Sequence, residues 1–511
     1  MTVQQVSAGR HYGMDWLRIG AFALLIFYHV GMVFVPWDFH ISLSRPIDWA
    51  TIPMLALNPW RMSLLFVVSG FASHALMGKT SDPGAFLAAR TSRLIAPLVF
   101  GMAVIVPPQS WVELTVKHGY GFSYLHFLAH DYFRFGALDG IILPTWNHLW
   151  FLAYLWTYTL LLGLALLILP ARLREASRRV TTRLLSGGRI VLLPLAWLAS
   201  VQFVLLPHRQ ETHALVGDWY AHAHYLPAFL FGFLLAASPE LWASIRRWAA
   251  PAAIAALVCY AAVATVEWTY PGLARPTPLM AYAFLAARAA MRWLAIVALL
   301  GLADRALNRD HRLRPMLTEA VFPLYLIHQT IIVFAAWALL RAGTAPLALF
   351  VLLVLVTAAG SWAFYLAGRS IGWLRPWIGL RPLPRRRRRR GRGGSGLNRL
   401  RAGEDGLARP SRRIGSLQRE KQRGVDHRRE AGRASEERLA TRAVEKRLQH
   451  HSFSLSFFGR PRGRCSGAAT FIPRRASASR SSTSISALTL RKSAAAARSS
   501  AAHRAGSTRS G

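Results

Sequence analysis

The chain has only two cysteines in 511 residues, which limits the classes of protein it can belong to. Cys259 lies in an apolar run and Cys465 in a polar segment, so they form neither a disulfide framework nor a pair with metal-ligand spacing. The sequence also contains no P-loop, no glycine-rich dinucleotide fingerprint and no H-E-x-x-H motif. We therefore predict no metal site and no tightly bound cofactor.

Acidic residues are also scarce, because 23 Asp and Glu stand against 62 Lys and Arg and give a formal net charge of +39. The excess is concentrated in residues 383–511, which hold 33 of the basic residues and only 8 of the acidic ones. Charge that lies mostly in one terminal segment is poor evidence that the rest of the chain binds nucleic acid. We therefore expect no nucleic-acid partner.

The same terminal segment differs from the rest in composition. It opens with Pro384 and six consecutive arginines and is dominated by Arg, Ser, Ala and Gly, so it cannot bury enough apolar area to fold. We predict a disordered basic tail over residues 383–511, after a membrane domain over residues 10–382. The tail either holds anionic lipid headgroups or is an extension without function, and its lack of periodicity favours the second.

Long apolar runs are abundant, and 53% of all residues are hydrophobic. A helix needs about 20 apolar residues to cross a hydrocarbon core about 30 Å thick. We find ten such runs and predict an all-α fold, a polytopic bundle of about ten transmembrane helices surrounded by membrane lipids. The runs cover residues 16–36, 54–77, 92–108, 148–169, 189–206, 221–237, 250–268, 280–302, 317–341 and 345–368.

The loops between these runs differ in positive charge. If the N-terminus is cytoplasmic, the inner loops contain fifteen Lys and Arg residues and the outer loops six. Cytoplasmic loops are enriched in Lys and Arg, so we predict that both termini face the cytoplasm, in a bacterial inner membrane. The first run is long and has no small-residue cleavage site, and we expect it to remain as a helix.

Charged and titratable residues inside a bilayer are costly, which makes them functional candidates. In the first run, Arg18 and His29 are eleven positions apart, so they lie on one helix face about 16 Å apart. Arg18 could instead be an interfacial cation paired with Asp15, and His29 a histidine satisfied by a neighbouring helix. Arg61 in the second run lies deep enough to need a partner or an anionic ligand.

Other runs contain small residues and further histidines. Ser69-Gly70 would let another helix approach closely. The fourth run begins near His148 and Trp150, and the ninth places Tyr325 and His328 on one face. The sixth run begins with two further histidines, His222 and His224, which can equally be interfacial residues. Because they are two positions apart on a helix, their rings point to different faces, and this argues against a metal site.

Together these motifs resemble the acyltransferase 3 family of ten-helix membrane O-acyltransferases. The resemblance covers residues of about 10 to 370. The sequence around Arg61 and Met62 is most similar to the branch of the family that takes part in glucan biosynthesis. Four features match in the family's order: Asp15-x-x-Arg18 with Arg18-x10-His29, Arg61 leading to Ser69-Gly70-Phe71, His148-Leu149-Trp150-Phe151-Leu152, and Tyr325-Leu326-Ile327-His328.

The resemblance implies transfer of an acyl group from acyl-CoA to a hydroxyl of a sugar or envelope glycan, as in O-acetylation. The partners would be acyl-CoA, which is a donor substrate and no bound cofactor, and a carbohydrate acceptor. Arg18 would bind the phosphates of CoA, because a guanidinium matches phosphate with a planar fork. The implied catalytic residues are His29 as general base, Arg61 or Tyr325 as oxyanion stabiliser, and His328; the implied substrate-binding residues are His148 and Trp150.

Two other classes of protein remain open at this point. Buried Arg and His also mark the substrate and proton paths of secondary transporters, although the two halves of this chain show no repeat. A membrane protein that binds a glycan without chemistry would carry similar residues. Consumption of acyl-CoA by membranes that contain the protein separates an acyltransferase from both.

Overall fold

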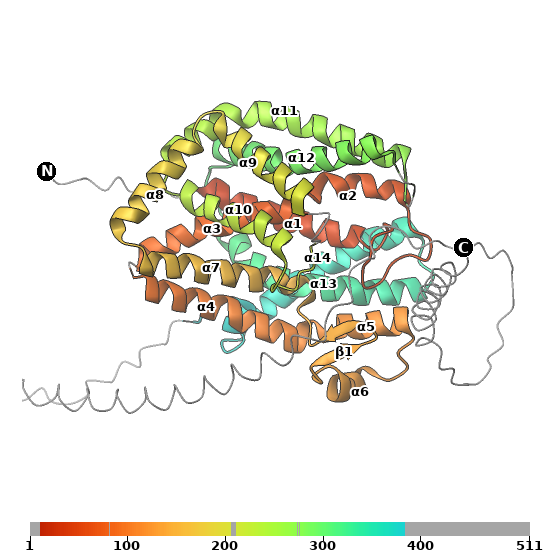
Figure 1. Cartoon of the computed structure of the whole chain (residues 1–511). Helices are drawn as coiled ribbons and strands as arrows, with labels where there is room; N and C mark the ends of the chain where they lie inside the picture. The colour runs from red at the N-terminus through yellow and green to blue at the C-terminus, as the bar shows by residue number, and fades with distance from the viewer. Residues whose placement is uncertain (1–10, 81, 206–210, 273, 275, 384–511) are drawn as a thin grey trace, which may run out of the picture. The chain divides into compact units, whose positions relative to one another are not determined.

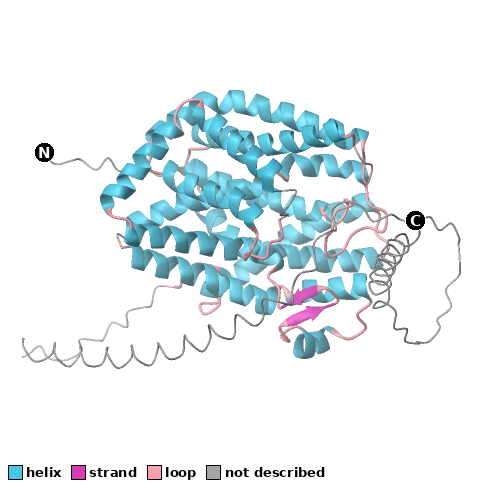
Figure 2. Cartoon of the chain, viewed as in Figure 1, coloured by secondary structure: helices cyan, strands magenta, loops and turns pink. Residues whose placement is uncertain are grey.

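A computed structural model describes residues 11–383, apart from 81, 206–210, 273 and 275. The described chain is almost entirely helical, with one short β-hairpin (Figures 1 and 2). The expected all-α membrane fold is therefore confirmed. The predicted basic tail lies, apart from Leu383, outside the described residues and stays a prediction.

Helices occupy all ten of the apolar runs. The helices of the third and fifth runs continue into π-helical turns, η2 (Gly101–Ile105) and η5 (Val201–Leu205). The ten helices are α1 (Tyr12–Gly31), α3 (Arg61–Thr80), α4 (Pro83–Phe100), α7 (Trp150–Ile168), α9 (Arg189–Ser200), α10 (Trp219–Leu235), α11 (Pro239–Thr269), α12 (Pro278–Arg305), α13 (Arg314–Arg341) and α14 (Pro346–Ser370).

Length and hydropathy alone support fewer spans than ten. Within the described part of the chain, seven helical segments are long and apolar enough to cross a membrane. An eighth is obtained if α8 (Ala171–Leu184) and α9 with η5 form one span bent by 95°. The other two helices are α1, which carries Asp15 and Arg18 near its start, and α10, which has only 17 residues. Both pack against helices of the first set, α1 against α13 and α10 against α3.

The connections contain short elements that the apolar pattern does not reveal. In the longest connection, β1 pairs antiparallel with β2 through a turn in which Asp139 and Gly140 both have positive φ, the geometry that Asp-Gly favours in hairpins. The short elements are η1 (Asp48–Ala50), α2 (Thr51–Leu57), α5 (Pro107–His118), α6 (Tyr124–His126), η3 (Phe127–Asp131), β1 (Gly136–Leu138), β2 (Ile141–Leu143), η4 (Asn147–Leu149) and η6 (Arg375–Ile378).

The second predicted run is divided between two helices. α2 ends at Leu57 and α3 begins at Arg61, with a turn at residues 58–60 that contains Pro59. Proline has no amide hydrogen to donate within a helix, and this favours a break here. Arg61 is therefore the first residue of a helix. The two helices still form one candidate membrane span, Asp48–Thr80, so the expected depth of Arg61 in the membrane stays a prediction.

Hydrogen bonds place α1 and α13 side by side and parallel. Nη2 of Arg18 donates to the carbonyl oxygen of Thr318 at 2.8 Å, and His29, eleven residues further along α1, lies beside His328, ten residues further along α13. Parallel packing is what an alternating bundle requires of its first and ninth helices. The expectation that Arg18 and His29 share one face of α1 is confirmed, because both face α13.

α3 and α10 cross at two glycines. A Cβ atom on Gly70 would overlap the carbonyl oxygen of Phe229, and a Cβ atom on Gly232 would overlap that of Val67. The two backbones are therefore in direct contact at this crossing, as small residues permit between membrane helices. The expectation of close helix approach at Gly70 is confirmed.

Candidate active site

Three histidines from three elements meet where α1, α13 and η4 come together. The ring centroids of His29 and His328 are 5.0 Å apart, and those of His148 and His328 are 5.2 Å apart. His328 and His148 are buried, whereas His29 is partly buried. The fold thus brings together residues that are up to 299 positions apart in the sequence.

The hydrogen bonds of two rings assign their tautomers. Nδ1 of His29 lies 3.0 Å from the carbonyl oxygen of Leu25, and Nδ1 of His328 lies 2.7 Å from that of Tyr325, so both Nδ1 atoms carry a hydrogen and donate it. Nε2 of His328 is then an acceptor, and it lies 3.2 Å from Nδ1 of His29. Nε2 of His29 is left unprotonated, and no described residue hydrogen-bonds it. His29 therefore presents an imidazole nitrogen with an available lone pair.

His148 is attached to α13 at two points. Its Nε2 donates to the carbonyl oxygen of Leu326 at 3.0 Å, and the hydroxyl of Tyr325 donates to the carbonyl oxygen of His148 at 2.7 Å. Nδ1 of His148 is then an acceptor, and it is buried without a partner among the described residues. An unpaired buried acceptor costs about 1–3 kcal/mol, so a ligand hydroxyl or a water molecule would bind favourably at this atom.

Arg61 packs on the residue that precedes His29. Its Cζ atom lies 3.3 Å from the centroid of the Tyr28 ring, a cation–π contact. The Tyr28 hydroxyl accepts a hydrogen bond from Asn58, whose Oδ1 accepts one from Arg288 at 2.8 Å. Nε of Arg61 is buried and has no partner in the described structure. This N–H group is available to an anionic or developing oxyanionic ligand.

Arg18 lies at the opposite end of the face that it shares with His29, about 16 Å away by helix rise. Besides its bond to Thr318, it is close enough to Arg90 of α4 for the two charges to repel each other. Arg90 is in turn repelled by Arg93. This end of the helices is therefore a cluster of positive charge that suits a polyanion.

The ring of Trp150 contacts residues outside the histidine cluster. Its ring stacks on that of His213, with centroids 4.1 Å apart and planes 18° apart. Nε2 of His213 lies 2.9 Å from Oε1 of Glu211, which also accepts from the Tyr225 hydroxyl at 2.7 Å. Burial raises the pKa of Glu211, but these hydrogen bonds and the charges of His213 and Arg292 outweigh burial and lower the pKa to about 2. The loop that contains His213 and packs on Trp150 therefore carries a stable carboxylate.

A chain of hydrogen bonds runs from Gln329, beside the histidine cluster, to α5. Gln329, next to His328 in α13, has its Nε2 2.8 Å from Nε2 of His40, whose Nδ1 lies 2.6 Å from a carboxylate oxygen of Glu113. Lys117 donates to the other oxygen of Glu113 at 2.9 Å. Burial raises the pKa of Glu113, but its hydrogen bonds with His40 and Lys117 outweigh burial and lower the pKa to about 2.

Sequence reasoning did not identify several of these charged or titratable residues, among them Arg288, Arg292, His40 and Glu113. The sequence does indicate Arg288 and Arg292, because two arginines four positions apart inside an apolar run are costly to insert and are therefore functional candidates. His40 and Glu113 are 73 positions apart in polar connections, where such residues are common, and nothing in the sequence pairs them.

Comparison with known proteins gives a family. Residues 11–366 match the acyltransferase 3 family, described as an acyltransferase domain. Similar proteins include glucans biosynthesis protein C from Escherichia coli O6:K15:H31 (strain 536 / UPEC) and from Escherichia coli O1:K1 / APEC. Each is 26% identical over 156 residues, which are 30% of this chain and 39% of the relative, so the match spans about two fifths of these relatives' length. No solved structure matches this chain.

The family match spans more than half of the chain and contains all the residues that suggested the resemblance. The similarity to glucans biosynthesis protein C agrees with the expected branch. The apolar helices are long enough to cross a membrane. The chain belongs to the acyltransferase 3 family, and its apolar helices make it an integral membrane protein.

Proposed function

We propose that this protein transfers an acyl group from acyl-CoA to a hydroxyl of a sugar or envelope glycan. The observation that carries the proposal is the lone pair on Nε2 of His29, left available by the hydrogen bonds of Nδ1 with Leu25 and His328. Acyl transfer to a hydroxyl needs a base of this kind. The name of the similar proteins, glucans biosynthesis protein C, favours a carbohydrate acceptor.

In the proposed reaction, Nε2 of His29 takes the proton of the acceptor hydroxyl while its oxygen attacks the carbonyl carbon of the thioester. A carbon–oxygen bond forms and the carbon–sulfur bond breaks. The proton on Nε2 then passes to the leaving thiolate, so the products are an ester and free CoA, and His29 is neutral again. His328 accepts the hydrogen bond of Nδ1 and holds the ring in the tautomer that the reaction needs.

The neighbouring groups have separate roles in this scheme. The free N–H of Arg61 stabilises negative charge on the thioester oxygen in the transition state. The hydroxyl of Tyr325 donates its hydrogen bond to the main-chain carbonyl of His148. Tyr325 therefore acts as a positioning residue. Nδ1 of His148 accepts a hydrogen bond from the acceptor substrate. Trp150, on whose ring His213 stacks, supports the loop that would contact the sugar.

Acyl-CoA approaches from the end of the bundle that carries Arg18. The charge cluster of Arg18, Arg90 and Arg93 suits the phosphates of CoA, which guanidinium groups bind through paired hydrogen bonds. The pantetheine arm would run along the face of α1 toward His29. We place this end in the cytoplasm of a bacterial inner membrane and the acceptor at the other side, because the inner loops carry the larger number of basic residues.

The test compares His29→Ala with the unchanged protein in cells, by mass spectrometry of the envelope glycans, and in nanodiscs, by release of CoA thiol from acetyl-CoA in the presence of those glycans. Loss of a general base lowers the rate by about 10²- to 10⁴-fold, with little change in donor affinity. His118→Ala is the matched control, because His118 is exposed at the end of α5.

Equal amounts of each protein in the membrane are required for this comparison. If His29→Ala releases CoA and modifies glycans at the rate of His118→Ala, His29 is only a packed histidine and the scheme is wrong. If both proteins release CoA but glycans are unmodified, the acceptor belongs to another class of molecule.

A further inference from the structure

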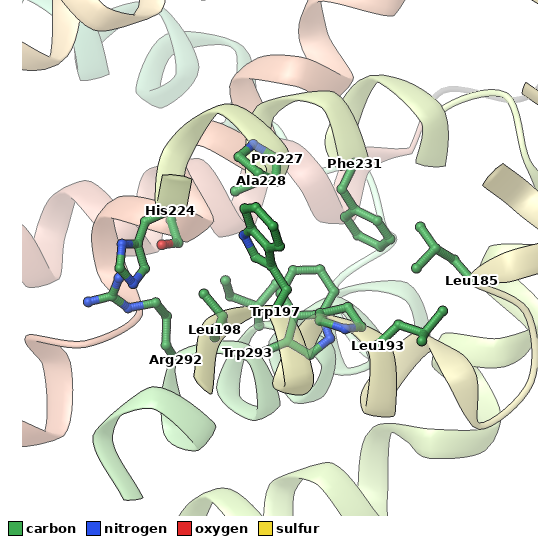
Figure 3. Close-up of a pocket in the computed structure, with 13 residues that line it drawn as sticks. Leu185, Leu193, Trp197, Leu198, His224, Pro227, Ala228, Phe231, Arg292 and Trp293 are labelled. Carbon is green, nitrogen blue, oxygen red and sulfur yellow. The ribbon is translucent and has the colours of Figure 1, made fainter. Parts of the chain in front are cut away.

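A cavity of about 240 Å³ lies among α9, α10 and α12, away from the three histidines (Figure 3). Most of its lining is apolar, and Leu198 and Phe231 are among the buried residues that form its walls. Leu193 and Trp197, on the same wall of α9, are 43% and 49% exposed. Because α9 lies in an apolar run, this side of the cavity faces the hydrocarbon of the bilayer.

Two prolines and two tryptophans build the walls of this cavity. Pro194 lies inside α9 and Pro227 inside α10, and neither can donate to the carbonyl group four residues earlier. Those two carbonyl oxygens instead accept from Nε1 of Trp293 at 2.7 Å and Nε1 of Trp197 at 2.9 Å. Hydrogen bonds from two side chains that line the cavity therefore join α9 to α12 and α9 to α10. These bonds fix the walls of the cavity.

One end of the cavity is polar, where Arg292 and His224 lie next to each other (Figure 3). Nε and Nη1 of Arg292 and the hydroxyl of Ser63 are buried there without hydrogen-bond partners among the described residues. Arg292 interacts with Tyr220 and Glu211, but these contacts leave the two N–H groups unused. A guanidinium is always charged, so unused donors in a buried site favour an anionic oxygen ligand.

The position of Arg292 selects the kind of anion. It lies near the middle of α12 and so near the middle of the bilayer, where the head group of a two-chain phospholipid would have to leave the interface. A carboxylate at the end of a single hydrocarbon chain can enter from the lipid side. A cavity of about 150 Å³ admits benzene in other proteins, so this larger cavity has room for a hydrocarbon segment.

We propose that this cavity is a lateral binding site for a long-chain carboxylate, with the carboxylate on Arg292 and the chain leaving between Leu193 and Trp197. The site is separate from the proposed acyl transfer at His29. Binding can therefore be measured without donor or acceptor, and its failure leaves the proposed function untouched.

The experiment uses the full chain in phosphatidylcholine nanodiscs and myristic acid that carries a photoreactive diazirine. Mass spectrometry of the cross-linked protein locates the label, which we expect on peptides of α9, α10 and α12. Arg292→Gln should weaken labelling by myristic acid about tenfold, the effect of losing hydrogen bonds to a charged group, and leave labelling by the matching myristyl alcohol unchanged. Leu198→Trp fills the cavity and should weaken both.

Arg288→Gln is the matched control, because Arg288 lies one turn away on α12 and hydrogen-bonds Asn58. Equal labelling of the Arg292→Gln and unchanged proteins by myristic acid would overturn the proposal. So would an equal loss in Arg288→Gln, which would show a general effect of charge. Dimyristoyl phosphatidylglycerol, added as a competitor, should displace myristic acid poorly; displacement as strong as that by unlabelled myristic acid would assign the site to a phospholipid phosphate instead.

Discussion

Arg18 and His29 share one face of α1, yet in the proposed reaction they contact different parts of the donor. Arg18→Ala should weaken the binding of a non-hydrolysable acyl-CoA thioether about tenfold, because hydrogen bonds to a charged phosphate are lost. Arg18→Lys should restore part of the affinity, since the charge survives but the planar fork does not. Calorimetry on the purified protein in nanodiscs measures both.

Arg45→Ala is the control for this prediction, because Arg45 is exposed in a predicted outer loop. Thermal unfolding of each variant is measured as well, since Arg18 also bonds Thr318 and its loss can loosen α1 from α13. Unchanged affinity in an Arg18→Ala protein of normal stability would remove Arg18 from the donor site.

Glu113 gives a prediction about pH. Its pKa is lowered from 4.5 to about 2 by hydrogen bonds with His40 and Lys117, which outweigh burial. A carboxyl group whose folded pKa is depressed adds stability that is complete above its unfolded pKa and is lost as pH falls through the folded pKa. Glu113→Gln should therefore lower the unfolding temperature by a few degrees at pH 7, and by progressively less as pH falls from about 4.5 to 2.

The matched control for this pH series is Glu175→Gln on α8, where the carboxylate is 47% exposed beside exposed arginines and such pairs add little stability. A constant difference between the Glu113→Gln and unchanged proteins from pH 7 to pH 3 would show that the ionised carboxylate does not stabilise the fold.

Single residues of the site were predictable where the bilayer makes them costly. His29, Arg61 and His328 interrupt apolar runs, and an interruption of this kind is visible without any structure. The pairing of His29 with His328 was not visible, because hydropathy says nothing about which helices are neighbours. The tautomers of His29 and His328 were also not predictable, because they depend on the positions of the carbonyl groups of Leu25 and Tyr325 in the packed helices.

Among the helices, the crossing of α3 and α10 gives the sharpest prediction. Gly70→Ala places a methyl group against the carbonyl oxygen of Phe229, and neither backbone can move without the other. Overpacking of this kind costs about 1–3 kcal/mol, so the variant should unfold at a clearly lower temperature and yield less folded protein. Gly78→Ala on the same helix is the control, because a methyl group there meets nothing within 4 Å.

Thermal unfolding in detergent, followed by fluorescence and by size-exclusion chromatography, compares the two alanine variants directly. Equal stability of Gly70→Ala and Gly78→Ala would mean that α3 and α10 are further apart than the structure places them.

The ranges of the long helices were readable from the sequence, because the thickness of the bilayer fixes how many apolar residues a crossing needs. The break before Arg61 was harder to read, since residues 54–77 form one apolar run and only Pro59, just before Arg61, indicated the turn. The elements between residues 109 and 147 are short and partly polar, so the apolar pattern did not reveal them.

For the whole molecule, two ion pairs join connections that an alternating bundle places at the same end. At one end, Arg246 before the middle of α11 pairs with Asp304 at the end of α12. At the other end, Lys117 of α5 pairs with Asp38 of the connection after α1. The first pair lies at or beside predicted inner loops and the second pair in predicted outer loops, so these two contacts agree with the alternation that the sequence predicts.

Which end faces the cytoplasm is predicted from the loop charges alone, and labelling can test this prediction. Ser177 of α8 and Ser44 after α1 are both exposed, and Ser→Cys changes little in volume at either position. In a chain with both native cysteines replaced by alanine, a membrane-impermeant maleimide should label Ser44→Cys in intact spheroplasts. It should label Ser177→Cys only after the membrane is opened, because α8 lies among the basic inner loops. The reverse pattern would invert the bundle, and it would place the charge cluster at Arg18 on the side where acyl-CoA is absent.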